Sequence, residues 1–273
     1  MIKQFPLTIH LFGQLRILVN GDALPRLRTR SVEWLLALLA LRHGRTVDRE
    51  WLAGTLWIES EPSQALKNLR NNLNYLRTAL EAEGARIQSP SRDTLTLDLE
   101  GADVDVVRFD RGIHADNEEA LRVAVGAYTG PLLEGCYEEW AHAERESRAA
   151  QCLQALERLA NTARERGELS QAIGYLRRAE MQDPMRDSTA RLLMASLDSA
   201  GDPAAALETY RRLRNRLQEE MAAEPDAETT RLFQEIRGHA KGAASGSEDR
   251  SKRATVGAAS LPNSGPAAVP IST

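Results

Sequence analysis

The chain has 273 residues, of which 42% are hydrophobic and 5% aromatic, and a net charge of −4 with a pI of about 5.8. This composition excludes a basic coat for nucleic acid, and no apolar run approaches the roughly 18 residues that a membrane span needs. Residues 1–100 nevertheless hold 13 Lys and Arg against 11 acids, whereas residues 101–240 hold 18 against 26. We therefore expect two domains, with local basic patches in the first.

Alternating apolar and polar residues fill positions 7–24 and are interrupted at Gly13–Gln14 and at Asn20–Gly21–Asp22. This pattern predicts short antiparallel strands joined by tight turns, because Asn-Gly is a strong hairpin signal. A broad apolar face from Arg30 to His43, ended by Gly44, predicts the first helix.

A second helix is predicted to begin at Asp48, whose side chain is a favourable N-cap. Pro62 occupies a first helical position and opens the third helix, which contains ALKNLRNNLNYLRTAL at residues 65–80. After Gly84, two alternating segments flank a turn at residues 89–93. Strands, three helices and a hairpin are the order of a winged helix-turn-helix domain, which we place at residues 1–100.

From Val104 onward the sequence indicates an almost entirely helical domain, and it contains an internal repeat. GELSQAIGYLRR at 167–178 aligns without a gap to GDPAAALETYRR at 201–212, a spacing of 34 residues. This is the tetratricopeptide period, and the alternative is a chance likeness of two amphipathic helices. We predict a mainly α protein with an all-α, tetratricopeptide-like domain at residues 101–240. The Gly-, Ala-, Ser- and Pro-rich residues 241–273 are predicted to be a disordered tail.

The third helix has one apolar face and one polar face. At about 100° per residue, its leucines share a side: Leu66, Leu69, Leu73, Leu76 and Leu80. The opposite side, which we call the reading face, consists of Gln64, Lys67, Asn68, Asn71, Asn74, Tyr75 and Thr78. Asparagine is a poor helix former, and no acid occurs between Pro62 and Leu80, so phosphate would not be repelled. Asn, Gln and Lys can bond base edges. We predict that this face reads DNA, and the alternative is an ordinary solvated surface.

Several arginines are candidates for phosphate contacts. Arg70 and Arg77 flank the apolar stripe of the third helix, and Arg92 lies in the predicted hairpin turn, from which it could enter a minor groove. Further candidates near the ends of the first two helices, each of which on its own also fits a solvated surface charge, are Arg26, Arg28, Arg30, Arg45 and Arg49. The tryptophans of the predicted helices are expected to be core residues, and these are Trp34, Trp51 and Trp57.

The sequence shows no catalytic signature. The histidines are scattered without metal-binding spacing, and GxSxG, HExxH and glycine-rich phosphate loops do not occur. Cys136 and Cys152 have no metal-type spacing and are typical of a reducing compartment. The N-terminus lacks the pattern of a signal peptide. We expect a cytoplasmic protein that is not an enzyme, needs no cofactor or metal and makes no membrane contact.

These stretches resemble bacterial transcriptional regulators that pair an OmpR-type winged helix with a bacterial transcriptional activation domain (BTAD), of which the SARP activators of antibiotic pathways are a branch. The likeness is carried by IHLFGQLRILVNG, RSVEWLLALLALRHGRTVDREWLAGTLW, ALKNLRNNLNYLRTAL, VDVVRFD, YTGPLLEG, EEWAHAERES and AAALETYRRL, and it covers about residues 5–238. Trp34 and the asparagine-rich reading face depart from the usual pattern. No receiver domain or nucleotide-binding loop is found.

The resemblance implies sequence-specific binding to double-stranded DNA, with protomers side by side on repeats as a homodimer, and recruitment of RNA polymerase. It implies that the third helix enters the major groove and the hairpin is the wing. Asn71 and Asn74 would then contact bases, and Arg70 and Arg77 phosphates. An alternative from another functional class is a helical-repeat scaffold protein whose first domain binds a protein partner instead of DNA. A third possibility is that the helical repeat surface binds a small molecule or peptide.

Overall fold

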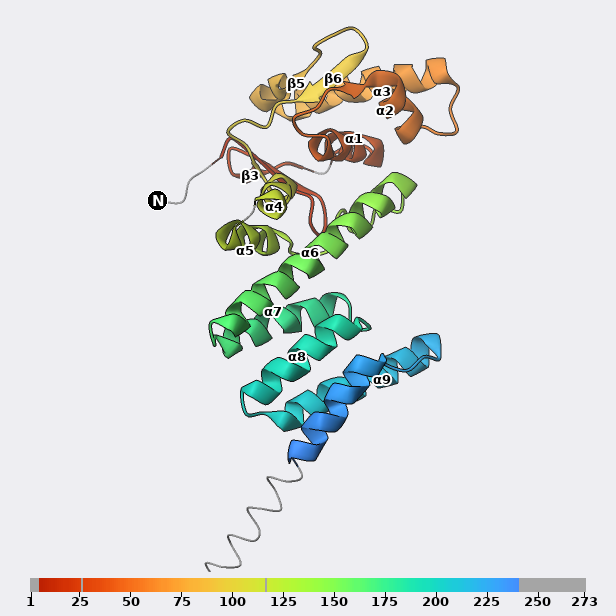
Figure 1. Cartoon of the computed structure of the whole chain (residues 1–273). Coiled ribbons are helices and arrows are strands. Elements are labelled where there is room, and N and C mark those ends of the chain that lie inside the picture. Colours follow the sequence, from red (N-terminus) through yellow and green to blue (C-terminus); the bar gives the residue numbers. More distant parts are fainter. Residues whose placement is uncertain (1–4, 26, 116, 241–273) are drawn as a thin grey trace, which may run out of the picture. The chain divides into compact units, whose positions relative to one another are not determined.

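The computed structural model describes residues 5–25, 27–115 and 117–240 (Figure 1). The predicted tail from Lys241 and the candidate Arg26 lie outside these ranges. The chain divides into two compact units, the first ending at Leu159 and the second beginning at Ala160.

The first unit begins with a small sheet whose strand order is β3-β2-β1-β7. β1 (Leu7–His10) pairs antiparallel with β2 (Arg16–Val19), which pairs with β3 (Asp22–Ala23). Between β2 and β3, Asn20 and Gly21 have φ of 53° and 90°, the left-handed conformation that the predicted Asn-Gly turn requires. The fourth strand, β7 (Asp103–Val104), was not predicted. It pairs parallel with β1, Thr8 opposite Asp103.

Three helices and a second sheet complete a winged helix. α1 (Arg30–Leu41), α2 (Arg49–Leu56) and α3 (Pro62–Ala79) follow the predicted order, and Asp48 caps α2 by accepting a 2.9 Å hydrogen bond from the Trp51 amide. A 3₁₀ helix, η1 (Glu81–Arg86), leads into β5 (Ile87–Gln88) and β6 (Thr94–Leu97), which form the wing. β4 (Val47–Asp48) adds to β6, so the sheet order is β4-β6-β5.

The apolar stripe of α3 packs into the core largely as predicted. Leu69, Leu73, Leu76 and Leu80 are at most 2% exposed. Leu66 differs from the prediction because it is only half-buried, and its neighbour Ala65 takes the buried position in the first turns.

The rest of the first unit consists of α4 (Asp105–His114), α5 (Glu118–Ala127) and the first part of α6 (Glu139–Glu165). Phe12, Phe109 and Tyr128 form an aromatic cluster with ring centroids 4.7–5.9 Å apart. The residues that follow β1 are therefore packed against α4 and the end of α5.

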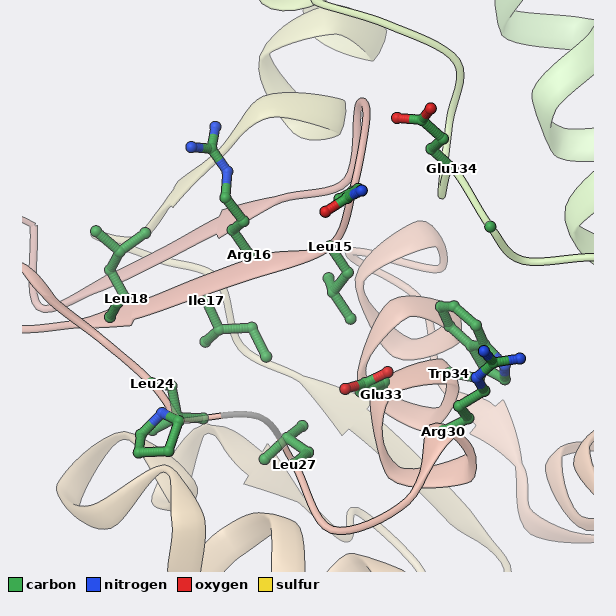
Figure 2. A pocket seen from close by; sticks show the side chains of 14 residues that line it. Leu15, Arg16, Ile17, Leu18, Leu24, Leu27, Arg30, Glu33, Trp34 and Glu134 are labelled. Atoms are coloured by element: carbon green, nitrogen blue, oxygen red, sulfur yellow. The ribbon is translucent and has the colours of Figure 1, made fainter.

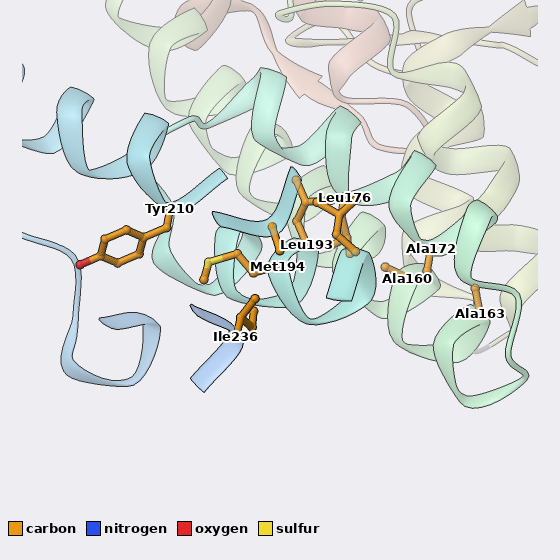
Figure 3. Close-up of a cluster of buried hydrophobic side chains, with 10 residues drawn as sticks. Ala160, Ala163, Ala172, Leu176, Leu193, Met194, Tyr210 and Ile236 are labelled. Carbon is orange, nitrogen blue, oxygen red and sulfur yellow. The ribbon is translucent and has the colours of Figure 1, made fainter. Parts of the chain in front are cut away.

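The second unit continues from α6 through α7 (Leu169–Gln182), α8 (Asp187–Ser199), α9 (Pro203–Met221) and a helical segment at 227–240. The predicted repeat is confirmed: the repeated glycines, Gly167 and Gly201, have φ of 76° and 82°, and each precedes a helix. Figure 3 shows the core, in which equivalent positions of the two repeats are both buried. These pairs are Ala172 with Ala206 and Leu176 with Tyr210. The fold is therefore mainly α, a winged helix-turn-helix followed by a tetratricopeptide-like repeat.

Candidate nucleic-acid interface

The predicted reading face lies on the outside of α3. Gln64, Lys67, Asn71, Asn74 and Thr78 are exposed. The other two members, Asn68 and Tyr75, are half-buried. Two local bonds involve this surface: the Gln64 amide donates to Asn68 Oδ1 over 2.9 Å, and the Thr78 hydroxyl donates to the Asn74 carbonyl over 3.0 Å. The side chains of Lys67, Asn71 and Asn74 make no hydrogen bond to any described residue, so they are available to a partner.

Three arginines gather where α2, α3 and the wing meet, and we call Arg49, Arg70 and Arg77 the arginine cluster. The guanidinium of Arg49 donates to Ser89 Oγ over 2.9 Å, and Arg77 approaches the same hydroxyl at 3.4 Å. Burial, followed by the positive charges of Arg77 and Arg70, lowers the pKa of Arg49, and Asp93 opposes this shift. Within the described residues, no carboxylate forms an ion pair with any of the three. Such a concentration of positive charge suits an anion.

The three arginines are not equally available to DNA. Arg77 also donates to the Ile87 carbonyl through Nε at 3.2 Å and through Nη2 at 2.8 Å, so it holds the start of the wing against α3. Arg70 is exposed and has no hydrogen bond to a described residue. Arg92 is exposed in the turn between β5 and β6. Sequence reasoning missed the positioning contact of Arg77, because the spacing of α3 does not reveal where the wing lies.

The tryptophans do not all meet the expectation of core residues. Trp51 is 40% exposed, and the guanidinium of Arg42 lies 5.3 Å from its ring centroid, so this prediction was wrong for Trp51. The reason is that α2 is short and buries only Leu52 and Ala53. Trp34 and Trp57 are half-buried.

Trp34 lines a cavity of about 640 Å³ between β2, the start of α1 and the loop around Gly135 (Figure 2). Leu15, just before β2, and Ile17 in β2 point toward α1, and Glu33 points from α1 into the same space.

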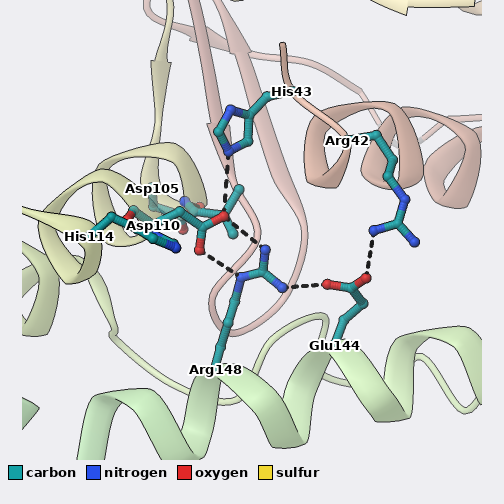
Figure 4. Close-up of polar contacts among 8 residues, drawn as sticks. Arg42, His43, Asp105, Asp110, His114, Glu144 and Arg148 are labelled. Atoms are coloured by element: carbon teal, nitrogen blue, oxygen red, sulfur yellow. Dashed lines mark hydrogen bonds and ion pairs between the residues drawn. The ribbon is translucent and has the colours of Figure 1, made fainter. Parts of the chain in front are cut away.

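A polar network joins the C-terminal end of α1 to α4 and α6, and sequence reasoning did not anticipate it (Figure 4). Arg148 binds Asp110 through Nε at 3.1 Å and Nη2 at 2.8 Å, and it binds Glu144 through Nη1 at 2.6 Å. Arg42 donates to the same Glu144 over 2.8 Å, and His43 lies 3.4 Å from Asp110. We call Arg42, His43, Asp110, Glu144 and Arg148 the junction network.

Two further contacts link the winged helix to the helices that follow. The carboxylate of Asp105, which is 2% exposed, accepts hydrogen bonds from the backbone amides of Leu11 at 2.9 Å and Phe12 at 3.0 Å. Burial raises the pKa of Asp105, and these amide bonds oppose the shift. Arg145 donates to the carbonyls of Leu132, Leu133 and Cys136, and so fixes the loop of the YTGPLLEG stretch.

None of the helices in the described part of the chain combines the length and apolar character needed to cross a bilayer.

Comparison with known proteins agrees with this architecture. Residues 104–237 match the family described as "Bacterial transcriptional activator domain". The chain is 32% identical over 230 residues to the transcriptional regulator RedD of Streptomyces coelicolor, covering 77% of this chain and 65% of RedD. It is 30% identical over 213 residues to the regulatory protein AfsR of the same organism, covering 74% of this chain but only 21% of AfsR.

Two more comparisons extend the likeness. The regulatory protein DnrI of Streptomyces peucetius is 26% identical over 244 residues, which cover 82% of this chain and 89% of DnrI. A solved structure, "Mycobacterium tuberculosis EmbR in complex with low affinity phosphopeptide", superposes with a TM-score of 0.68 at 21% identity, covering 86% of this chain and 66% of EmbR. At that identity the superposition supports the fold alone. Residues 104–237 thus belong to the bacterial transcriptional activator domain family, and the chain is similar to bacterial transcriptional regulators over about three quarters of its length.

Proposed function

We propose that the protein is a sequence-specific DNA-binding transcriptional activator. The observation that carries this proposal is the largely exposed, acid-free reading face of α3, with the arginine cluster beside it. Phosphate contacts by Arg49, Arg70 and Arg92 would set the register on the duplex, and the polar side chains of α3 would select bases. Arg77 would have two roles, because it would contact phosphate and also position the wing.

A direct test separates base reading from phosphate binding. We expect the double variant Asn71→Ala/Asn74→Ala to lose preference for a promoter site over random DNA, because each base contact contributes about 1–3 kcal/mol of discrimination. We expect Arg70→Ala to weaken all DNA alike and to reduce the slope of log K against log salt by about 1. Fluorescence anisotropy with labelled duplexes over a salt series measures both effects.

Two exposed residues of the second unit provide matched controls for these substitutions. Asn215→Ala and Arg177→Ala remove the same side-chain types from α9 and α7, and both should leave DNA binding unchanged. If the Asn71/Asn74 variant kept its full preference for the promoter site, α3 would not be the element that selects bases. Failure of the unaltered protein to bind any duplex would overturn the proposal in favour of a scaffold whose winged helix binds protein.

RNA polymerase is the partner that we propose for activation. Between α2 and α3, Ile58 is 82% exposed beside the exposed Glu59, which gives a partner an apolar anchor with an acidic rim. We expect Ile58→Ser to lower promoter activity in reconstituted transcription while DNA affinity stays the same. An unchanged transcript level would argue that polymerase contacts lie elsewhere.

We also propose that the protein forms a homodimer on repeated sites. Sedimentation of the protein with duplexes that carry one or two sites tests this. Bacterial DNA lies in the cytoplasm, so the proposed function also supports that location. The proposed activity is binding, and the prediction that the protein is not an enzyme and uses no cofactor stays a prediction. The same holds for the domain boundary at residue 100.

A further inference from the structure

The junction network forms one wall of a cavity of about 380 Å³ within the first unit. Its lining is predominantly basic. Besides the junction network, the residues that line the cavity are Leu41, Arg45, Arg111 and His114. A volume of this size lies within the range of small-molecule sites. The charges that stay unpaired within this lining therefore determine which ligand the cavity can bind.

The two acids of the cavity are fully engaged. Asp110 is bound by Arg148 and His43, and Glu144 is bound by Arg148 and Arg42. Two carboxylates and two guanidinium groups thus neutralise one another inside the network. The acids consequently have little capacity left to attract a cation.

Arg45 and Arg111 remain as cations that no acid among the described residues neutralises. Both are exposed, and neither side chain makes a hydrogen bond or ion pair with a described residue. They come from different elements, Arg45 from the segment after α1 and Arg111 from α4. A guanidinium is a planar fork that matches the oxygens of phosphate, and two such groups on one cavity favour an anion.

His114 contributes a third group of suitable chemistry. Its Nδ1 lies 2.6 Å from the carbonyl oxygen of Asp110, and because a carbonyl can only accept, Nδ1 carries the proton. Nε2 is then the ring nitrogen left over, and on protonation it becomes a donor for an anion in the cavity.

We propose that this cavity, the basic cavity, binds a small phosphate monoester through Arg45 and Arg111, with His114 as an additional donor. The anion would link the segment after α1 to α4, and so connect the winged helix with the first helix after it. DNA carries phosphate as well, but a cavity of about 380 Å³ admits a small molecule and not a duplex. This inference does not depend on the proposed DNA-binding function.

Isothermal titration of the full chain with glucose 6-phosphate, inorganic phosphate and glucose, at matched ionic strength, tests the proposal. We expect glucose 6-phosphate and inorganic phosphate to bind with Kd below about 10 mM, and glucose not to bind. Arg45→Gln and Arg111→Gln should each weaken the binding of glucose 6-phosphate at least about tenfold. Arg177→Gln, which removes an exposed arginine of α7, should leave it unchanged.

A DNA-binding measurement distinguishes the two sources of phosphate, a small molecule and a duplex. We expect Arg111→Gln to retain the DNA affinity of the unaltered protein, measured by anisotropy as above. If neither phosphate compound binds, or if Arg45→Gln and Arg111→Gln bind glucose 6-phosphate as well as the unaltered protein, the proposal is wrong. It is also wrong if these variants lose DNA affinity instead, because the two arginines then serve the duplex. If the unaltered protein does not bind DNA, only the proposed function is overturned, and the proposal for the basic cavity is not affected.

Discussion

Arg148 is the residue on which the junction network depends, since its side chain is only 9% exposed and bonds two carboxylates at once. Burial alone would raise the pKa of Asp110 and of Glu144. The hydrogen bonds from His43 and Arg148 to Asp110, and from Arg148 and Arg42 to Glu144, outweigh burial and hold both pKa values below the ordinary range. The network is therefore most favourable with both acids ionised.

Replacing Arg148 by Met should destabilise the first unit strongly. The substitution leaves two partly buried carboxylates without their main partner, which costs about 3–5 kcal/mol in comparable buried pairs. Urea unfolding at neutral pH, followed by circular dichroism, measures the loss. Arg108→Met removes a more exposed ion pair, with Asp103, and should cost below about 1 kcal/mol. Equal losses in the two variants would contradict this role of Arg148.

The same network predicts how stability depends on pH. Because the folded-state pKa values of Asp110 and Glu144 are lowered, their contribution is present above the unfolded-state values near 4 and is lost as pH falls through the folded values. The difference in unfolding free energy between the unaltered protein and Arg148→Met should therefore shrink on going from pH 7 to about pH 3. Urea midpoints at the two pH values measure it, and a constant difference would disprove the linkage.

At the scale of elements, α4 and α5 approach each other closely at Gly112. A Cβ at this position would lie 2.4 Å from the Ala120 carbonyl oxygen and 2.8 Å from the Ala124 Cβ. Both atoms belong to α5, so the added carbon would meet helix backbone as well as a side chain. The two helices can pack at this distance only because residue 112 lacks a side chain.

Gly112→Ala should therefore separate α4 from α5 and cost about 1–3 kcal/mol, the usual range for overpacking. Gly126→Ala is the matched control, since Gly126 is in α5 with open space around its Cβ position. That control should stabilise the helix by about 0.5–1 kcal/mol, because alanine has the higher helix propensity. Thermal unfolding of both variants measures the effects, and a neutral Gly112→Ala would show that the hairpin adapts freely.

At the scale of the whole molecule, the winged helix depends on residues beyond position 100. β7 pairs with β1, and Asp105 accepts the buried amides of Leu11 and Phe12. The ring of Phe12 also packs on Phe109 and Tyr128. A fragment of residues 1–100 would lose all of these partners at once.

We expect the fragment 1–100 to unfold at a lower temperature than the fragment 1–159 and to give poorly dispersed amide signals in NMR spectra. Unpaired buried amides cost about 1–3 kcal/mol each, so the loss is large relative to the stability of a small domain. The longer fragment retains β7 and Asp105. Equal melting temperatures for the two fragments would place the stable domain boundary near residue 100.

Local signals explain what the sequence could predict. Asn20–Gly21, the Asp48 cap and Pro62 act within a few residues, and the 34-residue repeat is visible as a spacing, so the elements and the fold class follow from them. The reading face follows from helical periodicity. The partners of Asp105, Arg145 and Arg148 do not follow, because these bonds depend on how distant segments pack, and a single sequence carries no record of that pairing.

The parallel pairing of Thr8 with Asp103 also determines the order in which the chain can fold during its synthesis. A ribosome that adds 5–20 residues per second needs about 5–20 s to reach β7 after β1 has been made. Throughout that interval β1 can pair with β2 on one side only, and its other edge can accept a strand from another chain. A nascent chain halted before Asp103 therefore exposes an open sheet edge, which closes only when the first residues of the activator domain emerge.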